Sequence, residues 1–148
     1  MFGHSQREIR RLTDQAAMVR PITERLMQNV KIAPGMRVLD PGCGAGDVSM
    51  LAAKLVGPTG EALGIDRNKD VLAVAAKRAR VAGFPQIRFE QAPAETFWHG
   101  QPFDFVIGRY VLVHQSDPIE FIRTAARRVK RGGSIAFHEI RLPQNLDS

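Results

Sequence analysis

The sequence contains a single cysteine, Cys43, and this scarcity excludes a framework of internal disulfides. So few cysteines are typical of a protein from a reducing compartment. Long hydrophobic runs are also missing, because Lys54 interrupts the best candidate, after Val48, before it could cross a bilayer. The first residues, which include His4 and Arg7, lack the apolar run of a secretory signal. These absences predict a cytoplasmic location.

The composition is that of an ordinary globular chain of 148 residues, 44% of them apolar and 24% charged. This length predicts one domain with a core of its own. The net charge of +6 would attract nucleic acid if it were clustered on one face. The basic residues are instead spread over several predicted helices, as Arg7, Arg78 and Arg127 illustrate. Solvated helix faces explain them more simply, and nucleic-acid binding is kept as the less favoured interpretation.

The stretch Met36–Gly46 organises the rest of the chain. It predicts a buried strand that ends near Asp40 and runs into a loop with glycine at every second position. One face of the following segment is apolar, at Val48, Leu51, Ala52 and Leu55. This period predicts a helix, so the loop would lie between a strand end and a helix N-terminus, where free N–H groups face a ligand.

The glycine spacing argues against a dinucleotide, whose Gly-x-Gly-x-x-Gly fingerprint would need a glycine where Asp47 stands. Asp40 lies two residues before the first glycine of the loop, where a carboxylate would repel a pyrophosphate but suits an ammonium or sulfonium group. A nicotinamide oxidoreductase is disfavoured for this reason. It is also disfavoured because His114, rather than the lysine of a short-chain dehydrogenase, follows Tyr110 by four residues.

In these residues the chain resembles the class I S-adenosylmethionine-dependent methyltransferases, whose first motif is an acid followed by Gly-x-Gly-x-Gly after a hydrophobic strand. Pro41 departs from the aliphatic residue that is commoner there. The resemblance implies an α/β fold, a Rossmann-like doubly wound parallel sheet with strand order 3-2-1-4-5. It implies S-adenosylmethionine as the cofactor and in-line methyl transfer to an acceptor. The cofactor-binding residues of this loop would be Asp40, Gly42, Cys43, Gly44, Ala45 and Gly46.

A second strand is expected over residues 62–66, and it ends in Asp66. An acid at this point, about twenty residues beyond a glycine loop, is placed to accept hydrogen bonds from two ribose hydroxyls. The alternative is that Asp66 caps the next helix, but Asn68 is available for that role. Arg67 either lies along the adenine face or points outward.

A third strand, residues 87–90, leads into Gln91 and Ala92. At this place the resemblance implies an acid followed by a small residue, with the acid side chain and the next backbone N–H reading the adenine edge. Gln91 stands in the acid position, and its carbonyl still accepts a hydrogen bond from an amine. Gln91 and Ala92 are therefore expected to bind the cofactor.

A fourth strand, residues 103–108, carries Arg109, Tyr110 and His114 beyond its end. This segment resembles the family's fourth motif, which passes beneath the transferable methyl group. The resemblance implies that Arg109 contacts the cofactor and that His114 or Tyr110 acts as a base, if the acceptor must lose a proton. His138 and Glu139 are more remote candidates, and the three residues His114, His138 and Glu139 show no recognisable metal-ligand spacing.

The acceptor is expected to be a small molecule. Enzymes of this class that methylate DNA bases carry Asn or Asp followed by Pro-Pro-aromatic after the fourth strand, and Gly108-Arg109-Tyr110 stands here instead. No cysteine lies there to attack a pyrimidine ring. The rival interpretation is a noncatalytic module that binds S-adenosylmethionine or RNA.

Before the first strand, residues 5–31 predict a helix that is interrupted at Pro21. Residues 1–32 would form a helical cap over the core of residues 33–148. Within this cap, Gln15, Arg20 and Thr23 could face the methionine end of the cofactor.

After the fourth strand, a helix is expected from Asp117 to Gly132, with its buried face at Ile119, Ile122, Ala126 and Val129. A fifth strand is expected over residues 134–140. The family fold continues with a helix and a hairpin, whereas this chain stops at Ser148. The edge of the fifth strand would then pair with a second copy, or residues beyond Ser148 are missing from the sequence.

Overall fold

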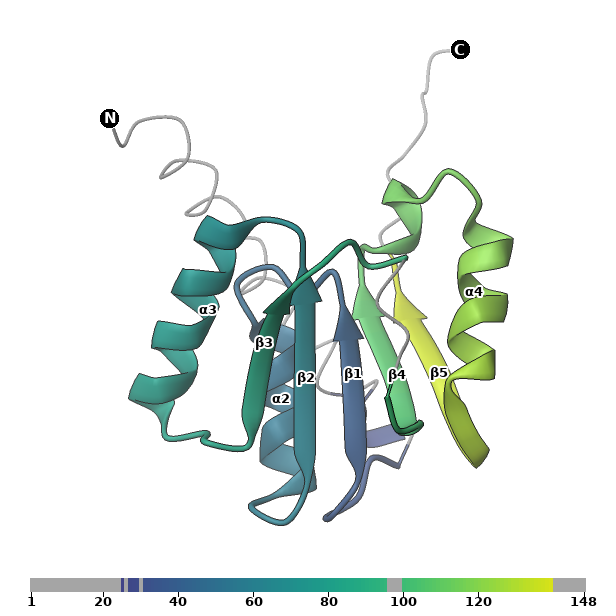
Figure 1. Cartoon of the computed structure of the whole chain (residues 1–148). Helices are drawn as coiled ribbons and strands as arrows, with labels where there is room; N and C mark the ends of the chain where they lie inside the picture. Colours follow the sequence, from purple (N-terminus) through teal and green to yellow (C-terminus); the bar gives the residue numbers. More distant parts are fainter. Residues whose placement is uncertain (1–24, 26, 30, 96–99, 140–148) are drawn as a thin grey trace.

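The structure is a computed structural model, and it describes residues 25, 27–29, 31–95 and 100–139. The sheet consists of β1 (Arg37–Pro41), β2 (Glu61–Asp66), β3 (Ile87–Gln91), β4 (Phe103–Arg109) and β5 (Val129–His138). The helices whose bounds lie within the described residues are α2 (Asp47–Val56), α3 (Lys69–Ala82) and α4 (Pro118–Arg127), with a short 3-10 helix, η1 (Leu112–His114). All paired strands run parallel, so their carboxyl ends meet at one edge of the sheet (Figure 1).

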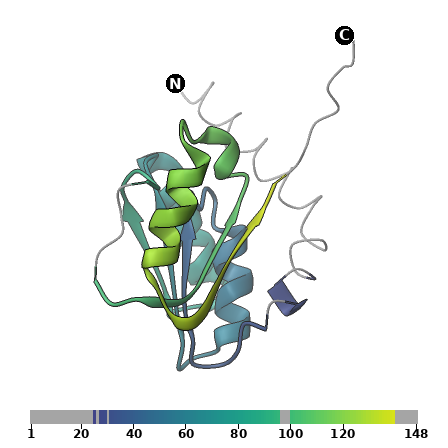
Figure 2. The same ribbon diagram turned by 90° about the vertical axis from the view of Figure 1, so that its right-hand side faces the viewer.

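The strand order is β3-β2-β1-β4-β5, which confirms the predicted Rossmann-like doubly wound sheet. Alternate residues of each central strand enter different cores, because side chains of a strand point to opposite faces. Val38 packs with α2 on one face, whereas Leu39 packs with Phe121 of α4 on the other. Figure 2 shows α2 and α4 on opposite sides of the sheet. Covering both faces suits a parallel sheet of near-continuous apolar strands.

Two helix starts follow the chemistry of the sequence. The Asn68 side chain accepts hydrogen bonds from the backbone N–H groups of Asp70 and Val71, which caps α3 and leaves Asp66 free of that role. Asp117 accepts from the N–H of Glu120 at the start of α4, with proline at the first helical position. Both caps confirm the prediction.

The end of α4 was predicted wrongly. The helix ends at Arg127, and β5 already begins at Val129, which had been expected on the buried face of the helix. Its buried residues are Phe121 and Ala125, whereas Ile119 is 64% exposed. The reason is a large bulge in β5: Phe103 pairs with Val129 but Phe105 pairs with Ser134, so the glycine corner lies inside the strand.

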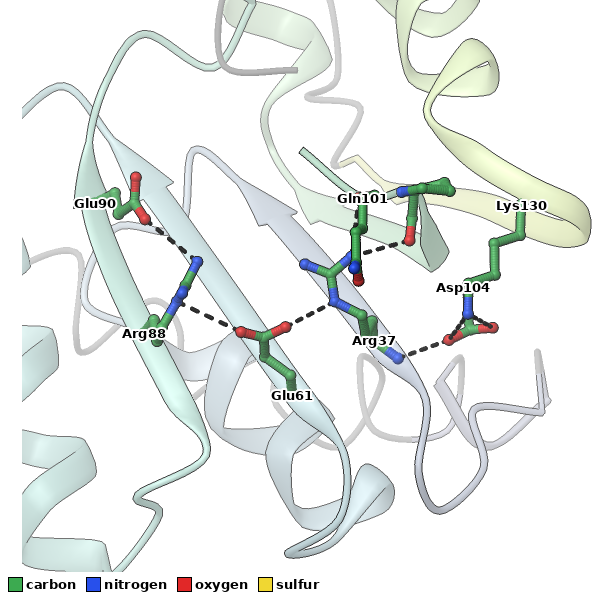
Figure 3. Close-up of polar contacts among 8 residues, drawn as sticks. Arg37, Glu61, Arg88, Glu90, Gln101, Asp104 and Lys130 are labelled. Atoms are coloured by element: carbon green, nitrogen blue, oxygen red, sulfur yellow. Dashed lines mark hydrogen bonds and ion pairs between the residues drawn. The ribbon is translucent and has the colours of Figure 1, made fainter. Parts of the chain in front are cut away.

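Ion pairs tie the amino-terminal ends of the strands together (Figure 3). Arg37 of β1 donates through Nε to Glu61 of β2 at 2.7 Å and through Nη1 to the carbonyl oxygens of Gln101 and Pro102 at 2.9 Å. Its guanidinium also lies 4.4 Å from the centre of the Phe103 ring. Arg37 therefore links β1 to β2 and to the segment that leads into β4.

Replacing Arg37 by methionine is expected to lower the free energy of unfolding by about 1 to 3 kcal/mol, because three hydrogen bonds of a charged group are lost while the stem is kept. Arg123→Met is the matched control. Arg123 has a side chain 69% exposed and a 4.0 Å pair with Glu120, so it should change stability by less than about 0.5 kcal/mol. Urea unfolding measures both, and equal effects would contradict the role of Arg37.

Some predictions lie outside the described residues. These are most of the helix interrupted at Pro21, the facing residues Gln15, Arg20 and Thr23, and the chain from residue 140 onward. Of the helix predicted over residues 5–31, residues 25 and 27–29 are described and are helical, as expected. The division into a cap of residues 1–32 and a core of residues 33–148 stays a prediction. Within the described ranges, no helix has the length and apolar character that spanning a membrane requires.

Candidate functional site

A cavity of about 620 Å³ lies at the carboxyl ends of the strands, around the ends of β1, β2 and β4. The strand order reverses at β1, which places the cavity where open parallel sheets bind their ligands. Its walls come from four parts of the chain: the glycine loop, the end of β2, residues 94–95, and the segment from Arg109 to Thr124.

The glycine loop forms one wall of the cavity. Gly42, Gly44 and Gly46 all have positive φ angles, of 66°, 55° and 89°. A Cβ on Gly44 would meet no protein atom within 4 Å, and Gly44 lines the cavity. This bare backbone therefore lets a ligand come close to the loop.

Asp40 lies within β1, is 1% exposed and lines the cavity. The Ser49 hydroxyl of α2 donates to its Oδ2 at 2.7 Å. Burial raises the pKa of Asp40 to about 7, although the Ser49 hydrogen bond and the charge of Arg109 lower it. Burial thus disfavours the charged form of this carboxyl group, and a cation in the cavity would favour it.

Asp66 ends β2 and lines the same cavity. Its Oδ2 accepts from the N–H of Gly44 and its Oδ1 from the N–H of Asn68, each at 2.9 Å. Each carboxylate oxygen keeps lone pairs, so the side chain is fixed and still accepts hydrogen bonds from a ligand. The neighbouring Arg67 also lines the cavity, with its guanidinium 3.1 Å from Glu95 and its side chain 70% exposed.

Three charged residues support the floor of the cavity. Arg109, with a side chain 9% exposed, lies 3.8 Å from Asp47. Asp47 also pairs with Arg78 of α3 at 3.0 Å, and Arg78 donates to the carbonyl oxygen of Ala45 at 2.8 Å. The prediction that Arg78 belongs to a solvated helix face was therefore wrong, because its guanidinium braces the glycine loop.

Tyr110 and His114 both line the cavity. Tyr110 has a φ of 61°, in the left-handed region that a tyrosine rarely adopts. Burial raises the pKa of its phenol, so the hydroxyl is protonated at neutral pH. His114 ends η1 and is exposed, and its role as a base stays a prediction.

Ten of the predicted residues thus share one cavity: Asp40, Gly42, Cys43, Gly44, Ala45, Asp66, Arg67, Arg109, Tyr110 and His114. Gly46, Gln91 and Ala92 do not line it. A Cβ on Gly46 would lie 3.1 Å from that of Ala75, so this glycine faces α3 instead.

The segment after β3 enters the cavity later than expected. The Gln91 side chain donates to the carbonyl oxygen of Arg67, and the N–H of Ala92 donates to the carbonyl oxygen of Asp66 at 2.9 Å. The backbone bond of Ala92 continues the pairing of β2 with β3, and Ala94 and Glu95 line the cavity instead. The sequence does contain a small residue next to an acid, Ala94 and Glu95, three positions after Gln91 and Ala92.

Other residues of the site gave no signal in the sequence. Val111, 4% exposed, packs so that a Cβ on Gly42 would lie 3.1 Å from it, and Phe121 and Thr124 line the cavity from α4. These three residues belong to no recognisable sequence motif, and only the folding of the chain brings them close to the glycine loop.

The remote candidates His138 and Glu139 do not line the cavity. Glu139 instead accepts from the N–H groups of Leu112 and Val113, both at 3.3 Å, and so holds η1. Among the described residues, no group of three or more His, Cys, Asp or Glu side chains could hold a metal ion.

The chain is similar to several known proteins. A family model described as a methyltransferase domain matches residues 32–148. The chain is 30% identical over 118 residues to a demethylmenaquinone methyltransferase of Bacillus cytotoxicus, covering 79% of this chain and 50% of that protein. It is 31% identical over 121 residues to a ubiquinone biosynthesis O-methyltransferase of Methylococcus capsulatus, covering 80% and 49%.

Among solved structures, an arsenic(III) S-adenosylmethionine methyltransferase from Chlamydomonas reinhardtii matches with a TM-score of 0.65 and 32% identity, covering 75% of this chain and 42% of that one. The chain spans about half the length of the curated relatives it matches.

Proposed function

Because the chain belongs to the methyltransferase domain family, we propose that it binds S-adenosylmethionine in the cavity and transfers the methyl group to a small-molecule acceptor. The observation that carries the proposal is the pair of carboxyl groups, Asp40 and Asp66, which line one cavity from adjacent strands with the open Gly44 beside them. A nucleoside with hydroxyls at one end and a sulfonium charge at the other complements this arrangement.

The reaction requires no covalent bond between the protein and the methyl group. Methyl transfer is an in-line displacement, and holding sulfonium and nucleophile in line accounts for about 7 to 11 kcal/mol of barrier lowering in favourable cases. The walls of the cavity would exclude water and align the two reactants. His114 would accept a proton where the acceptor must lose one.

The proposed acceptor is a small organic molecule. The two curated relatives are named for demethylmenaquinone and for ubiquinone biosynthesis, and the solved relative for arsenic(III). None of these names refers to a nucleic acid. Transfer of labelled methyl groups from the cofactor to a panel of small phenols, carboxylates and amines would separate an enzyme from a noncatalytic module that only binds S-adenosylmethionine.

Titration calorimetry tests the binding step. The protein should bind S-adenosylmethionine and its demethylated product, S-adenosylhomocysteine, more tightly than NAD. The reason is that the loop lacks the third glycine of a dinucleotide fingerprint and Asp40 disfavours a pyrophosphate. Tight binding of NAD alone would overturn the proposal.

Replacing Asp66 by alanine should weaken binding of S-adenosylhomocysteine by about 1 to 3 kcal/mol, since charge-assisted hydrogen bonds to the ribose are lost. Calorimetry measures the change against the wild type. Glu90→Ala, on the neighbouring strand β3 and outside the cavity lining, is the control and should leave the affinity unchanged. An unchanged dissociation constant for Asp66→Ala would mean that the ribose binds elsewhere.

We also propose, as a separate point, that a second copy pairs along β5. Within the described part of the chain, β5 is hydrogen-bonded to β4 alone, and an unpaired parallel edge favours association. Light scattering would show a dimer if this is right and a clean monomer if it is wrong.

A further inference from the structure

Two residues at the carboxyl end of β4, Arg109 and Tyr110, line the cavity and carry side chains that donate hydrogen bonds. The Arg109 guanidinium lies 5.7 Å from the centre of the Tyr110 ring, and its side chain is 9% exposed. Both residues line the cavity, as does Asp40, whose ionisation Arg109 favours through its charge. Arg109, which also pairs with Asp47 at 3.8 Å, and Asp40 therefore bring opposite charges to the same cavity.

The Tyr110 hydroxyl has no hydrogen-bond partner among the described residues, although its oxygen is shielded from water. A buried hydroxyl without a partner costs about 1 to 3 kcal/mol. The backbone that carries it is also strained, with φ at 61°. Neighbouring structure holds this conformation: the N–H of Tyr110 donates to the carbonyl oxygen of His138 at 2.9 Å, and the two rings lie 5.9 Å apart.

The chemistry of the pair selects the kind of ligand. A guanidinium only donates hydrogen bonds, and a phenol whose pKa is raised by burial keeps its proton and donates as well. Two donors, one of them charged, favour an oxygen anion over an amine.

We propose that Arg109 and Tyr110 form a subsite for an oxyanion, a carboxylate or a phenolate, at the carboxyl end of β4. The inference rests on the proposed function, because the cavity must first hold the cofactor. The oxyanion has two sources of the same chemistry, the amino-acid carboxylate of the cofactor and an acidic group of the methyl acceptor. Tyr110 is in either case a positioning residue.

Tyr110→Phe removes the hydroxyl and keeps the ring. If the carboxylate belongs to the cofactor, this variant binds S-adenosylhomocysteine about tenfold more weakly than the wild type, while 5′-methylthioadenosine, which lacks the amino acid, binds as before. Asp66→Ala is the matched control. It should weaken both ligands alike, because both contain the ribose.

If Tyr110→Phe leaves the affinity for both nucleosides unchanged, a second experiment tests whether the oxyanion belongs to the acceptor. Benzoate is titrated into wild type and variant saturated with S-adenosylhomocysteine, and loss of benzoate binding in the variant assigns the oxyanion to the acceptor. The subsite is overturned if the variant binds both nucleosides and benzoate as tightly as the wild type does. It is also overturned if the variant loses equal affinity for the two nucleosides. Failure of the wild type to bind any of these nucleosides would instead overturn the proposed function.

Discussion

Asp40→Asn is expected to make the protein more stable at pH 8, by up to about 4 kcal/mol in the free energy of unfolding. Asp40 is 1% exposed, and its pKa is raised from 3.8 to about 7, chiefly by burial. Ionising this carboxyl in the folded protein therefore costs free energy that an asparagine of the same shape does not cost.

The sign of the pH dependence follows from the two pKa values. The folded protein holds the Asp40 proton more tightly than the unfolded chain, so stability falls as the pH rises from about 4 to about 7 and then levels off. Between pH 5 and pH 8 the free energy of unfolding of the wild type should fall by about 2 to 3 kcal/mol because of Asp40, and that of the asparagine variant should not show this fall.

Urea unfolding of both proteins at pH 5 and pH 8 measures this difference. The Ser49 hydroxyl, which donates to Asp40 at 2.7 Å, hydrogen-bonds equally well to the amide oxygen, so the packing is preserved. A stability difference between variant and wild type that is the same at both pH values would show that Asp40 is not a buried ionisable group.

The same substitution should impair binding. S-Adenosylmethionine carries a sulfonium charge that its demethylated product lacks, so Asp40→Asn should lower the ratio of their affinities at pH 8 by about tenfold. A carboxylate kept in the interior at the expense of stability is expected at a functional site. An unchanged ratio would mean that the sulfonium lies far from Asp40.

Gly44→Val should weaken cofactor binding strongly and leave the fold intact. A side chain on Gly44 meets no protein atom within 4 Å and enters the cavity, where it occupies space needed by the ligand. We expect the affinity for S-adenosylhomocysteine to fall by at least about thirtyfold, as measured by calorimetry.

Gly83→Val is the matched control for this substitution. Gly83 follows α3 with φ at 81°, its Cβ would also meet nothing within 4 Å, and it lies outside the cavity lining. Both variants should lose about 1 to 2 kcal/mol of stability from the left-handed backbone, but only the loop variant should lose the ligand. Equal affinities of the two variants would contradict the placement of the ligand at Gly44.

Much of the fold could be predicted because local signals agree with one another. Asn68 and Asp117 were visible as helix caps, and the strands begin and end within a residue or two of their expected bounds, apart from β5. The exception is the corner after α4, where apolar spacing continued through Val129 although the chain had already turned into β5. The spacing of apolar residues indicates a helix, but it does not show at which residue the chain begins to pair with a neighbouring strand.

The site was predicted where backbone geometry and chemistry coincide in one short segment, as in the glycine loop with Asp40. It was missed where hydrogen bonding between strands decides the outcome. The N–H of Ala92 pairs with Asp66 and delays the entry of the chain into the cavity until Ala94. Arg78 likewise contacts the loop only because α3 packs beside it, a relation between segments that no local pattern contains.

The most direct test of the central claim, that the cavity between Asp40 and Asp66 holds the cofactor, is a map of backbone amide shifts on titration with S-adenosylhomocysteine. We expect the largest changes at residues 42–46, 66–67 and 94–95. Changes centred instead on the groove between α2 and α3, which Met50, Lys54 and Val81 line, would contradict it.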